Sequence, residues 1–251
     1  MIGPAALHVL GHELRWRLVT ELCDSDHKVG ELAMATGQAQ NLVSYHLRLL
    51  REAGLIRERR GSADARDIYY SLDRRAVTRG LLGALAAINP GAGLLTSEQR
   101  LGAGRKARPI SVLFLCTGNS ARSQIAEAIL REQGEGRVMV RSAGTHPVGV
   151  HPQVYHALAA RGIEVGKLRS KSVAQFEGHA FDYVVTLCDI VRTQPMRLVG
   201  KPRLIHWSIP DPAMARGGRA AMATAFDRVA SEIQVRVEDF YADLRARPSA
   251  A

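Results

Sequence analysis

The feature that most constrains the fold is a cysteine that stands between an apolar run and a helix-forming segment. Residues 111–115 read Ser-Val-Leu-Phe-Leu, which is typical of a buried parallel strand. The run leads into Cys116, a glycine-containing loop and Arg122, and a helix is predicted from about Ser123. This order predicts an α/β unit with a cradle for a tetrahedral oxyanion, because loop N–H groups and a helix N-terminus attract anions.

The residue types in this loop suit nucleophilic chemistry on such an anion. We expect Cys116 to be the nucleophile, because the positive field of the loop favours its thiolate form. Arg122 can bind two oxygens in a fork, Ser123 is placed to donate a hydrogen bond to the sulfur, and Asn119 can brace the loop. The residues expected to bind the anion are Thr117, Gly118, Asn119, Ser120, Ala121 and Arg122. The Cys-x5-Arg spacing alone is a weak signal, and the flanking strand and helix make it specific.

A segment rich in glycine and basic residues divides the chain at 90–109. Helical patterns dominate before it, whereas strand-like runs alternate with helical segments after it. A chain of 251 residues also has the length for two domains of about 100 to 150 residues. We therefore predict a first domain at 1–89, a linker at 90–109 and a second domain at 110–247.

The first domain has the pattern of a helix-turn-helix followed by a β-hairpin. Apolar residues recur at helical spacing over 7–22, and two further helices are predicted at 29–35 and 40–53. The hairpin is predicted from strands at 55–60 and 67–72. The helix at 40–53 is expected to direct four apolar residues inward: Leu42, Val43, Leu47 and Leu50. This layout places a second helix in a DNA major groove and leaves the hairpin as a wing.

The run 43–56, together with Tyr69-Tyr-Ser-Leu72, resembles the arsenical-resistance repressor family (ArsR/SmtB type) over roughly residues 5–87. The resemblance implies a winged helix-turn-helix domain that binds double-stranded DNA and forms a homodimer through the helix at 75–88. It also implies the residues that face the groove, which are Gln38, Gln40, Asn41, Ser44, Tyr45 and Arg48. The alternative is that these residues are only the solvated face of an amphipathic helix.

The chain departs from this family at the metalloid sensor. Members of the arsenic-sensing branch carry a Cys-Val-Cys run where this chain reads Lys28-Val29-Gly30, and the domain's one thiol is Cys23. Trivalent arsenic needs about three thiolates, so this domain alone does not supply a complete sensor. Cys23 with its acidic and histidine neighbours is better explained as a helix-end cysteine, and we predict no metal site.

The second domain resembles the low-molecular-weight phosphatase and arsenate reductase superfamily from about Pro109 to Leu244. The resemblance rests on four runs in this order: 116–127, 140–145, 183–188 and 206–212. It implies a parallel, four-stranded α/β sheet wrapped by helices, with the site at the carboxyl ends of the strands. Asp211, which precedes Pro212, matches the general acid of both enzyme types.

Several residues favour arsenate over phosphotyrosine as the substrate. The pair His206-Trp207 looks like the reductase version, Gln124 stands where tyrosine phosphatases usually place proline, and Ala213 and Met214 replace the phosphatases' aromatic residues. The expected activity is therefore arsenate reductase. Two alternatives remain open, a protein-tyrosine phosphatase with a regulatory DNA-binding domain and an oxyanion-sensing transcriptional regulator.

The second thiol, Cys188, is the decisive residue for this choice. If 184–187 forms a strand parallel to the first, Cys188 emerges at the same sheet edge as Cys116, close enough for a thiol relay. A phosphatase needs no such thiol, although a strand-end cysteine can also serve as a small apolar side chain. Thioredoxin-coupled reductases carry a further cysteine where this chain reads 189–195 without one. We expect no bound cofactor and an external reductant, which is mycothiol with mycoredoxin, glutathione or thioredoxin. Two routes stay open: the reductant reopens a Cys116–Cys188 disulfide, or a small thiol resolves the arsenic adduct directly and Cys188 takes no part.

Composition adds little to this assignment. The formal charge of +10 favours a polyanionic partner, although an arginine-rich proteome gives the same balance. No run approaches the ~20 apolar residues of a membrane span, and the N-terminus lacks the pattern of a secretory leader. The chain has three cysteines, too few and too scattered for a disulfide framework. We therefore expect a cytoplasmic protein without membrane contact.

Overall fold

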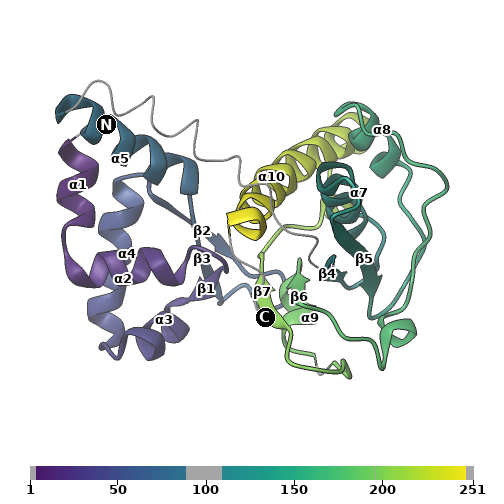
Figure 1. Ribbon diagram of the computed structural model, residues 1–251, viewed down its shortest axis with the longest axis horizontal. Coiled ribbons are helices and arrows are strands. Elements are labelled where there is room, and N and C mark those ends of the chain that lie inside the picture. Colours follow the sequence, from purple (N-terminus) through teal and green to yellow (C-terminus); the bar gives the residue numbers. More distant parts are fainter. Residues whose placement is uncertain (1–3, 89–108, 195, 247–251) are drawn as a thin grey trace. The chain divides into compact units, whose positions relative to one another are not determined.

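The structure is a computed structural model that describes residues 4–88, 109–194 and 196–246. The chain divides into two compact units, residues 1–106 and 107–251. Figure 1 colours the first unit purple to blue and the second teal to yellow. Each unit has its own hydrophobic core. The predicted linker at 90–109 lies outside the described residues except for Pro109.

The first unit is a helix-turn-helix with a three-stranded antiparallel sheet in the order β1-β3-β2. Its elements are α1 (Pro4–Leu10), α2 (Glu13–Glu21), β1 (His27–Lys28), α3 (Val29–Thr36), α4 (Gln40–Glu52), β2 (Ile56–Arg60), β3 (Ile68–Leu72) and α5 (Arg74–Ile88). Strands β2 and β3 pair from Ile56↔Leu72 to Arg60↔Ile68, which makes the predicted wing. The predicted winged helix-turn-helix fold is confirmed.

Two details of the first unit differ from the prediction. The helical pattern over 7–22 is broken into α1 and α2, because His12 is extended and its Nδ1 caps α2 by accepting from Leu14 N at 3.2 Å. On α4, Leu42 is 40% exposed and was wrongly placed inward. The buried residues are Val43, His46, Leu47 and Leu50, spaced i, i+3, i+4, i+7, so the histidine takes the inward position.

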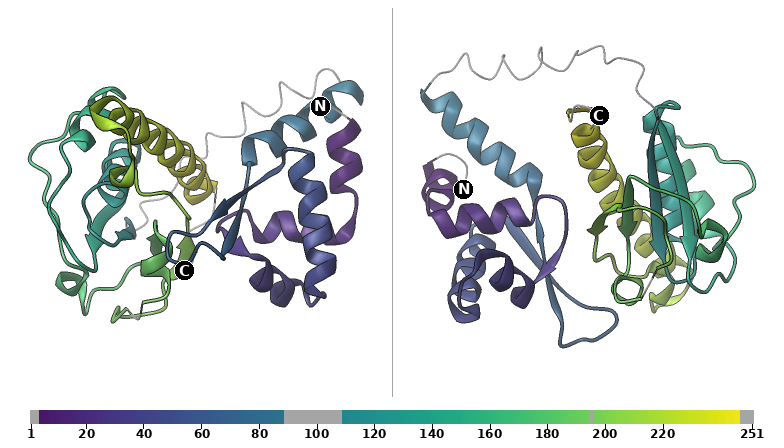
Figure 2. Two further views of the ribbon diagram at one scale, coloured as in Figure 1. Left: turned by 180° about the vertical axis from the view of Figure 1, so that it is seen from behind. Right: turned by 60° about the horizontal axis from the view of Figure 1, so that its bottom comes forward.

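The second unit is a sheet of four parallel strands in the order β5-β4-β6-β7, flanked by helices, as predicted. Its elements are β4 (Ile110–Cys116), α7 (Arg122–Gly134), β5 (Val138–Gly144), α8 (Gln153–Ala159), η2 (Val173–Phe176), β6 (Tyr183–Thr186), α9 (Asp189–Arg192), β7 (Arg203–His206), η3 (Pro212–Met214) and α10 (Gly218–Ala246). Helix α10 packs against α7 and α8, as Figures 1 and 2 show from three sides.

The central strand β4 pairs with β5 and β6 and so aligns the carboxyl ends of these strands. All its residues from Ser111 to Cys116 are buried, which is expected for a strand covered on both faces. Cys116 pairs with Gly144 at the end of β5, and Leu115 pairs with Thr186 at the end of β6. The last residues of β4, β5 and β6 therefore lie beside one another at the carboxyl edge of the sheet. In the described parts of the chain, no helix is both long and apolar enough to cross a membrane.

Candidate active site

The loop from Cys116 to Arg122 connects β4 to α7 and is held from outside by backbone hydrogen bonds. The carbonyl oxygens of Thr117, Gly118 and Ser120 accept from three backbone N–H groups at 2.9, 3.1 and 2.9 Å. The donors are His146, Val148 and His151. In a planar trans peptide the C=O and N–H point in opposite directions, so these outward carbonyls leave loop N–H groups facing the other way. The loop thus has the form of an anion cradle.

Gly144 lies so close to the cradle that no side chain fits. A Cβ atom placed there would lie 2.6 Å from Thr117 O and 2.7 Å from Asn119 N, both of them backbone atoms. Asn119 itself has a left-handed backbone (φ 44°), a conformation that asparagine tolerates better than most residues. The shape of the loop therefore depends on a residue of the neighbouring strand.

Cys116 is buried, and its sulfur lies 2.9 Å from Ser123 Oγ. Asn119 Nδ2 donates to the same Ser123 oxygen at 2.8 Å. Because that bond occupies a lone pair of the oxygen, the Ser123 hydroxyl hydrogen is free to point at the sulfur and to stabilise a thiolate. Ser123 thus lies against the sulfur and Asn119 against Ser123, and their roles in the reaction stay predictions.

A chain of buried polar groups continues behind Asn119. Its Nδ2 donates to Ser142 Oγ at 2.9 Å, and Ser142 in turn donates to the Glu127 carboxylate. Lys171 Nζ lies 3.0 Å from that carboxylate, and Arg131 also pairs with it. Because Ser142 donates its hydroxyl hydrogen to Glu127, its oxygen accepts from the Asn119 amide, which donates its second hydrogen to Ser123.

Sequence reasoning assigned no role to the three residues behind Asn119. Glu127 and Ser142 lie inside the runs that carry the family resemblance, which was the available signal. Lys171 lies 44 positions beyond Glu127, and no local pattern links the two residues. Gln124 also holds Asn119 in place, because its Nε2 donates to Asn119 Oδ1 at 2.9 Å and to Arg169 O at 2.9 Å. From the sequence, Gln124 was named only as a residue that favours the reductase.

Arg122 begins α7 and carries a donor that is still available. Its Nη1 donates to Ile209 O at 3.0 Å, and its Nη2 pairs with Asp211 Oδ2 at 2.7 Å. Its Nε is buried and has no hydrogen-bond partner within the described residues. A buried guanidinium N–H without an acceptor is costly, so the position favours a bound oxyanion. The structure thereby brings Asp211 to the same end of the loop.

Cys188 lies beside the cradle. Strand β6 ends next to β4, and Leu187 N donates to Leu115 O at 2.7 Å, which carries the chain past the end of the sheet in register with Cys116. The Cys188 sulfur lies 3.3 Å from Thr117 Oγ1 and is buried, and it is a free thiol. The second thiol therefore contacts the loop at Thr117, and a relay between Cys188 and Cys116 stays a prediction.

Each of the six residues predicted to face DNA is exposed, and all but Gln38 lie on α4. Ser44 Oγ donates to Gln40 O at 2.8 Å, and the Arg48 guanidinium lies 5.4 Å from the centroid of the Tyr45 ring. Both pairs lie on α4. The exposed surface provides amide, hydroxyl and guanidinium groups, the types that contact bases and phosphates. Groove contact by these residues stays a prediction.

Lys28 stands where arsenic-sensing repressors carry a cysteine, and its ammonium group is paired with a carboxylate. Lys28 Nζ lies 2.5 Å from Asp67 Oδ2, and this hydrogen bond raises the pKa of Lys28. The same nitrogen lies over the Tyr69 ring, 5.5 Å from its centroid. Lys28 therefore ties the start of α3 to the wing through charge.

The parallel sheet and the loop define a class of protein, the α/β proteins in which a cysteine at the end of the first strand faces a tetrahedral oxyanion. The model described as low molecular weight phosphotyrosine protein phosphatase matches residues 111–249, more than half of the chain. The chain therefore belongs to that family. The model described as bacterial regulatory protein, arsR family, matches residues 12–58. The chain is thus a fusion of the two types, as both resemblances implied.

Curated relatives that match the second unit include several arsenate reductases. An arsenate reductase of Halalkalibacterium halodurans is 34% identical over 129 residues, which are 51% of this chain and 93% of the relative. The glutaredoxin arsenate reductase of Synechocystis is 29% identical over 53% of this chain and 97% of the relative. A solved structure described as an arsenate reductase in the phosphate binding state is 28% identical, with a TM-score of 0.47, over 53% of this chain and 98% of that one.

Proposed function

We propose that this chain reduces arsenate to arsenite at Cys116 and that its first unit is a DNA-binding regulatory domain. The observation that carries the proposal is the Cys188 thiol, 3.3 Å from Thr117 in the anion loop. Phosphate ester hydrolysis uses the cysteine, the arginine and the acid, but it has no use for a second thiol at that place. The arsenate reductases among the relatives support the same choice.

The first step joins arsenic to the enzyme. Arsenate lies in the loop, where the backbone N–H groups and the Arg122 guanidinium bind its oxygens. The Cys116 thiolate attacks arsenic and forms an S–As bond, and one arsenate oxygen leaves as water after it receives a proton from Asp211. Asp211 now pairs with Arg122 at 2.7 Å, so the bound oxyanion must share the guanidinium with it.

The second step is the reduction. The Cys188 thiolate attacks the Cys116 sulfur, an S–S bond forms, and the S–As bond breaks. The electron pair of the broken bond stays on arsenic, which passes from As(V) to As(III) and leaves as arsenite. The two thiols have lost two electrons together, and an external thiol system must reopen the disulfide. The relative named as a glutaredoxin arsenate reductase supports a reductant of this chemical kind.

Arsenite release by the full chain tests the proposal. We would supply mycothiol with mycoredoxin, glutathione with glutaredoxin, and thioredoxin in separate reactions, and measure arsenite in each. We expect turnover with at least one system and none in Cys116→Ser. Absence of arsenite with all of them, together with rapid aryl phosphate hydrolysis, would establish a protein-tyrosine phosphatase instead. Absence of any turnover, with arsenate-dependent DNA binding, would establish an oxyanion sensor.

The proposed DNA-binding function rests on the arsR-type helix-turn-helix and the exposed side chains of α4. We expect the full chain to bind its own upstream DNA, with an affinity that falls as salt rises because phosphate contacts release counterions. Asn41→Ala with Ser44→Ala should weaken specific binding by about tenfold or more. A control pair on α10, Thr224→Ala with Gln234→Ala, should leave binding unchanged. A gel shift over a salt series measures both effects.

We also propose a homodimer through α5. Leu82 and Leu85 are 37% and 45% exposed and lie one helical turn apart, which gives α5 an apolar surface to pair with a second copy. Such a dimer suits an operator with two half-sites. A protein that regulates transcription must reach the chromosome, so we expect it in the cytoplasm. Sedimentation of Leu82→Glu, expected to be monomeric, checks the interface.

A further inference from the structure

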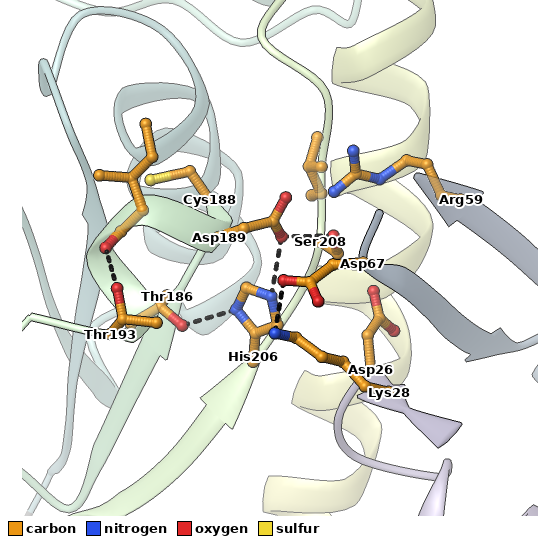
Figure 3. Close-up of polar contacts among 12 residues, drawn as sticks. Asp26, Lys28, Arg59, Asp67, Thr186, Cys188, Asp189, Thr193, His206 and Ser208 are labelled. Atoms are coloured by element: carbon orange, nitrogen blue, oxygen red, sulfur yellow. Dashed lines mark hydrogen bonds and ion pairs between the residues drawn. The ribbon is translucent and has the colours of Figure 1, made fainter. Parts of the chain in front are cut away.

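The residue that follows Cys188 is held by side chains from the neighbouring strand. Asp189 begins helix α9, and its Oδ1 accepts a hydrogen bond from Ser208 Oγ at 2.5 Å. The same oxygen lies 3.1 Å from Nε2 of His206, the last residue of β7. Figure 3 shows both side chains converging on this carboxylate. These hydrogen bonds therefore hold the start of α9 against the end of β7.

The second nitrogen of His206 continues the network. His206 Nδ1 lies 2.8 Å from Thr186 Oγ1, and Thr186 is the residue that pairs with His206 in the sheet. Thr186 stands two positions before Cys188 and Asp189 stands one position after it. His206 thus contacts one residue before Cys188 and one residue after it.

The Cys188 side chain itself points the other way. In Figure 3 its sulfur is directed away from the Asp189 carboxylate, and it contacts Thr117 Oγ1 at 3.3 Å. Helix α9 has four residues, and its bond from Arg192 N to Cys188 O is long, at 3.4 Å. The helix alone gives the thiol little backbone support. Leu187 N, bonded to Leu115 O, holds the chain on one side of Cys188, and the network of Asp189, His206 and Ser208 holds it on the other.

We propose that Asp189, fixed by His206 and Ser208, is the positioning residue of the Cys188 thiol. It acts through the backbone of residues 188 and 189 and keeps the sulfur beside the anion loop, within reach of Cys116. This inference rests on the proposed function, in which the Cys188 thiolate displaces arsenic from the Cys116 sulfur. Attack on a bound sulfur requires close alignment, and misplacement by about 1 Å costs on the order of a hundredfold in rate.

The test compares disulfide formation with hydrolysis in the full chain. Reduced Asp189→Asn would be mixed with arsenate, quenched at intervals and analysed by mass spectrometry for the Cys116–Cys188 disulfide. We expect that disulfide to form about tenfold or more slowly. Aryl phosphate hydrolysis and the KM for arsenate should stay within about twofold of the wild type, because Cys116, Arg122 and Asp211 are unaffected.

The chain offers a matched control and a rescue. Asp182 lies just before β6, at the end of that strand opposite to Cys188, and accepts from Ser111 N and Oγ of β4, both at 2.8 Å. Asp182→Asn should leave the ratio of disulfide formation to hydrolysis unchanged. Ser208→Ala should slow disulfide formation selectively, and Ser208→Thr, which keeps the hydroxyl, should restore it. A disulfide rate in Asp189→Asn equal to that of the wild type, or an equal slowing in Asp182→Asn, would overturn the inference.

A second oxidant separates this inference from the proposed function. Diamide takes two electrons from the two thiols without arsenate, so it forms the same disulfide in a chain that is no reductase. Slow diamide oxidation in Asp189→Asn beside rapid oxidation of the wild type supports the positioning role even if arsenite is never released. Release of arsenite with equal diamide rates in both chains supports the proposed function and contradicts the positioning role.

Discussion

At the scale of single residues, the proposed nucleophile Cys116 is bonded to Ser123, and Asn119 and the buried groups behind it hold Ser123 in place. Cys116, Asn119, Arg122 and Ser123 were predictable because they share one short loop whose chemistry is local. Gly144 and the buried chain behind Asn119 were not, since these contacts join segments 15 to 44 positions apart. Hydrogen bonds of that range depend on strand register, which the local pattern leaves open.

Gly144 provides a steric test of the loop. Gly144→Ala would place a methyl group 2.6 Å from Thr117 O, and the loop would have to open. We expect binding of inorganic phosphate, measured by calorimetry, to weaken by about tenfold or more. Gly166→Ala, where nothing lies within 4 Å of an added Cβ, is the matched control and should bind as the wild type does. Equal phosphate affinity in the two variants would show that the close approach has no role.

Ser123 provides a test of the bond to the sulfur. Hydrogen bonds to a charged group contribute about 1.5–3 kcal/mol, which corresponds to roughly 10- to 100-fold in rate. Ser123→Ala should lower kcat/KM by that factor for arsenate and for aryl phosphate, because both reactions begin with the Cys116 thiolate. Thr193→Ala, which removes a hydroxyl on the exposed side of α9, should change neither rate. Steady-state assays decide, and an unimpaired Ser123→Ala would remove this bond from the account.

At the scale of elements, helix α4 shows which of its features the sequence pattern predicts and which it does not. Its ends were predicted within a residue, because Gly54 follows the helix with a left-handed backbone (φ 71°). Its buried stripe was predicted with one error, since Leu42 was placed inward and His46 was left out. Burial of the histidine follows from the 3.6-residue period, with rings packed beside it: His12 lies 4.4 Å away between centroids.

His46 makes the first unit sensitive to acid. Burial, followed by the charges of His12 and Arg15, lowers the pKa of His46 below its ordinary value of 6.5. The folded state thus disfavours the protonated form, so the stability is fully present above about pH 6.5 and is lost as pH falls toward the folded pKa. The loss is at most about 1.4 kcal/mol per pH unit. Protection of the α4 amides against hydrogen exchange, corrected for intrinsic rates, measures it.

A histidine substitution separates this effect from general acid unfolding. His46→Gln should flatten the loss of α4 protection between pH 7.5 and pH 5.5, and His8→Gln, at an exposed histidine of α1, should not. If the pH dependence of His46→Gln matched that of the wild type, another group would have to carry it.

At the scale of the whole molecule, two units with separate cores are joined in one chain. Their fold types were predictable because one pattern has the helical period throughout and the other alternates apolar strands with helices. The domain limits at 89, 90–109 and 247 stay predictions. The sequence already showed that the first unit lacks the thiolates for arsenite, and Lys28 bound to Asp67 occupies that position in the structure. The first unit, with Cys23 as its one cysteine, therefore does not supply three thiolates for arsenite.

The central claim is that the two thiols deliver two electrons to arsenic, and a single turnover without reductant tests it most directly. The reduced full chain would be mixed with arsenate, quenched, and assayed for arsenite and for the Cys116–Cys188 disulfide. The account predicts about one arsenite and one disulfide for each chain, and neither in Cys188→Ser. A wild-type chain that hydrolyses aryl phosphate but yields no arsenite and no disulfide would contradict it.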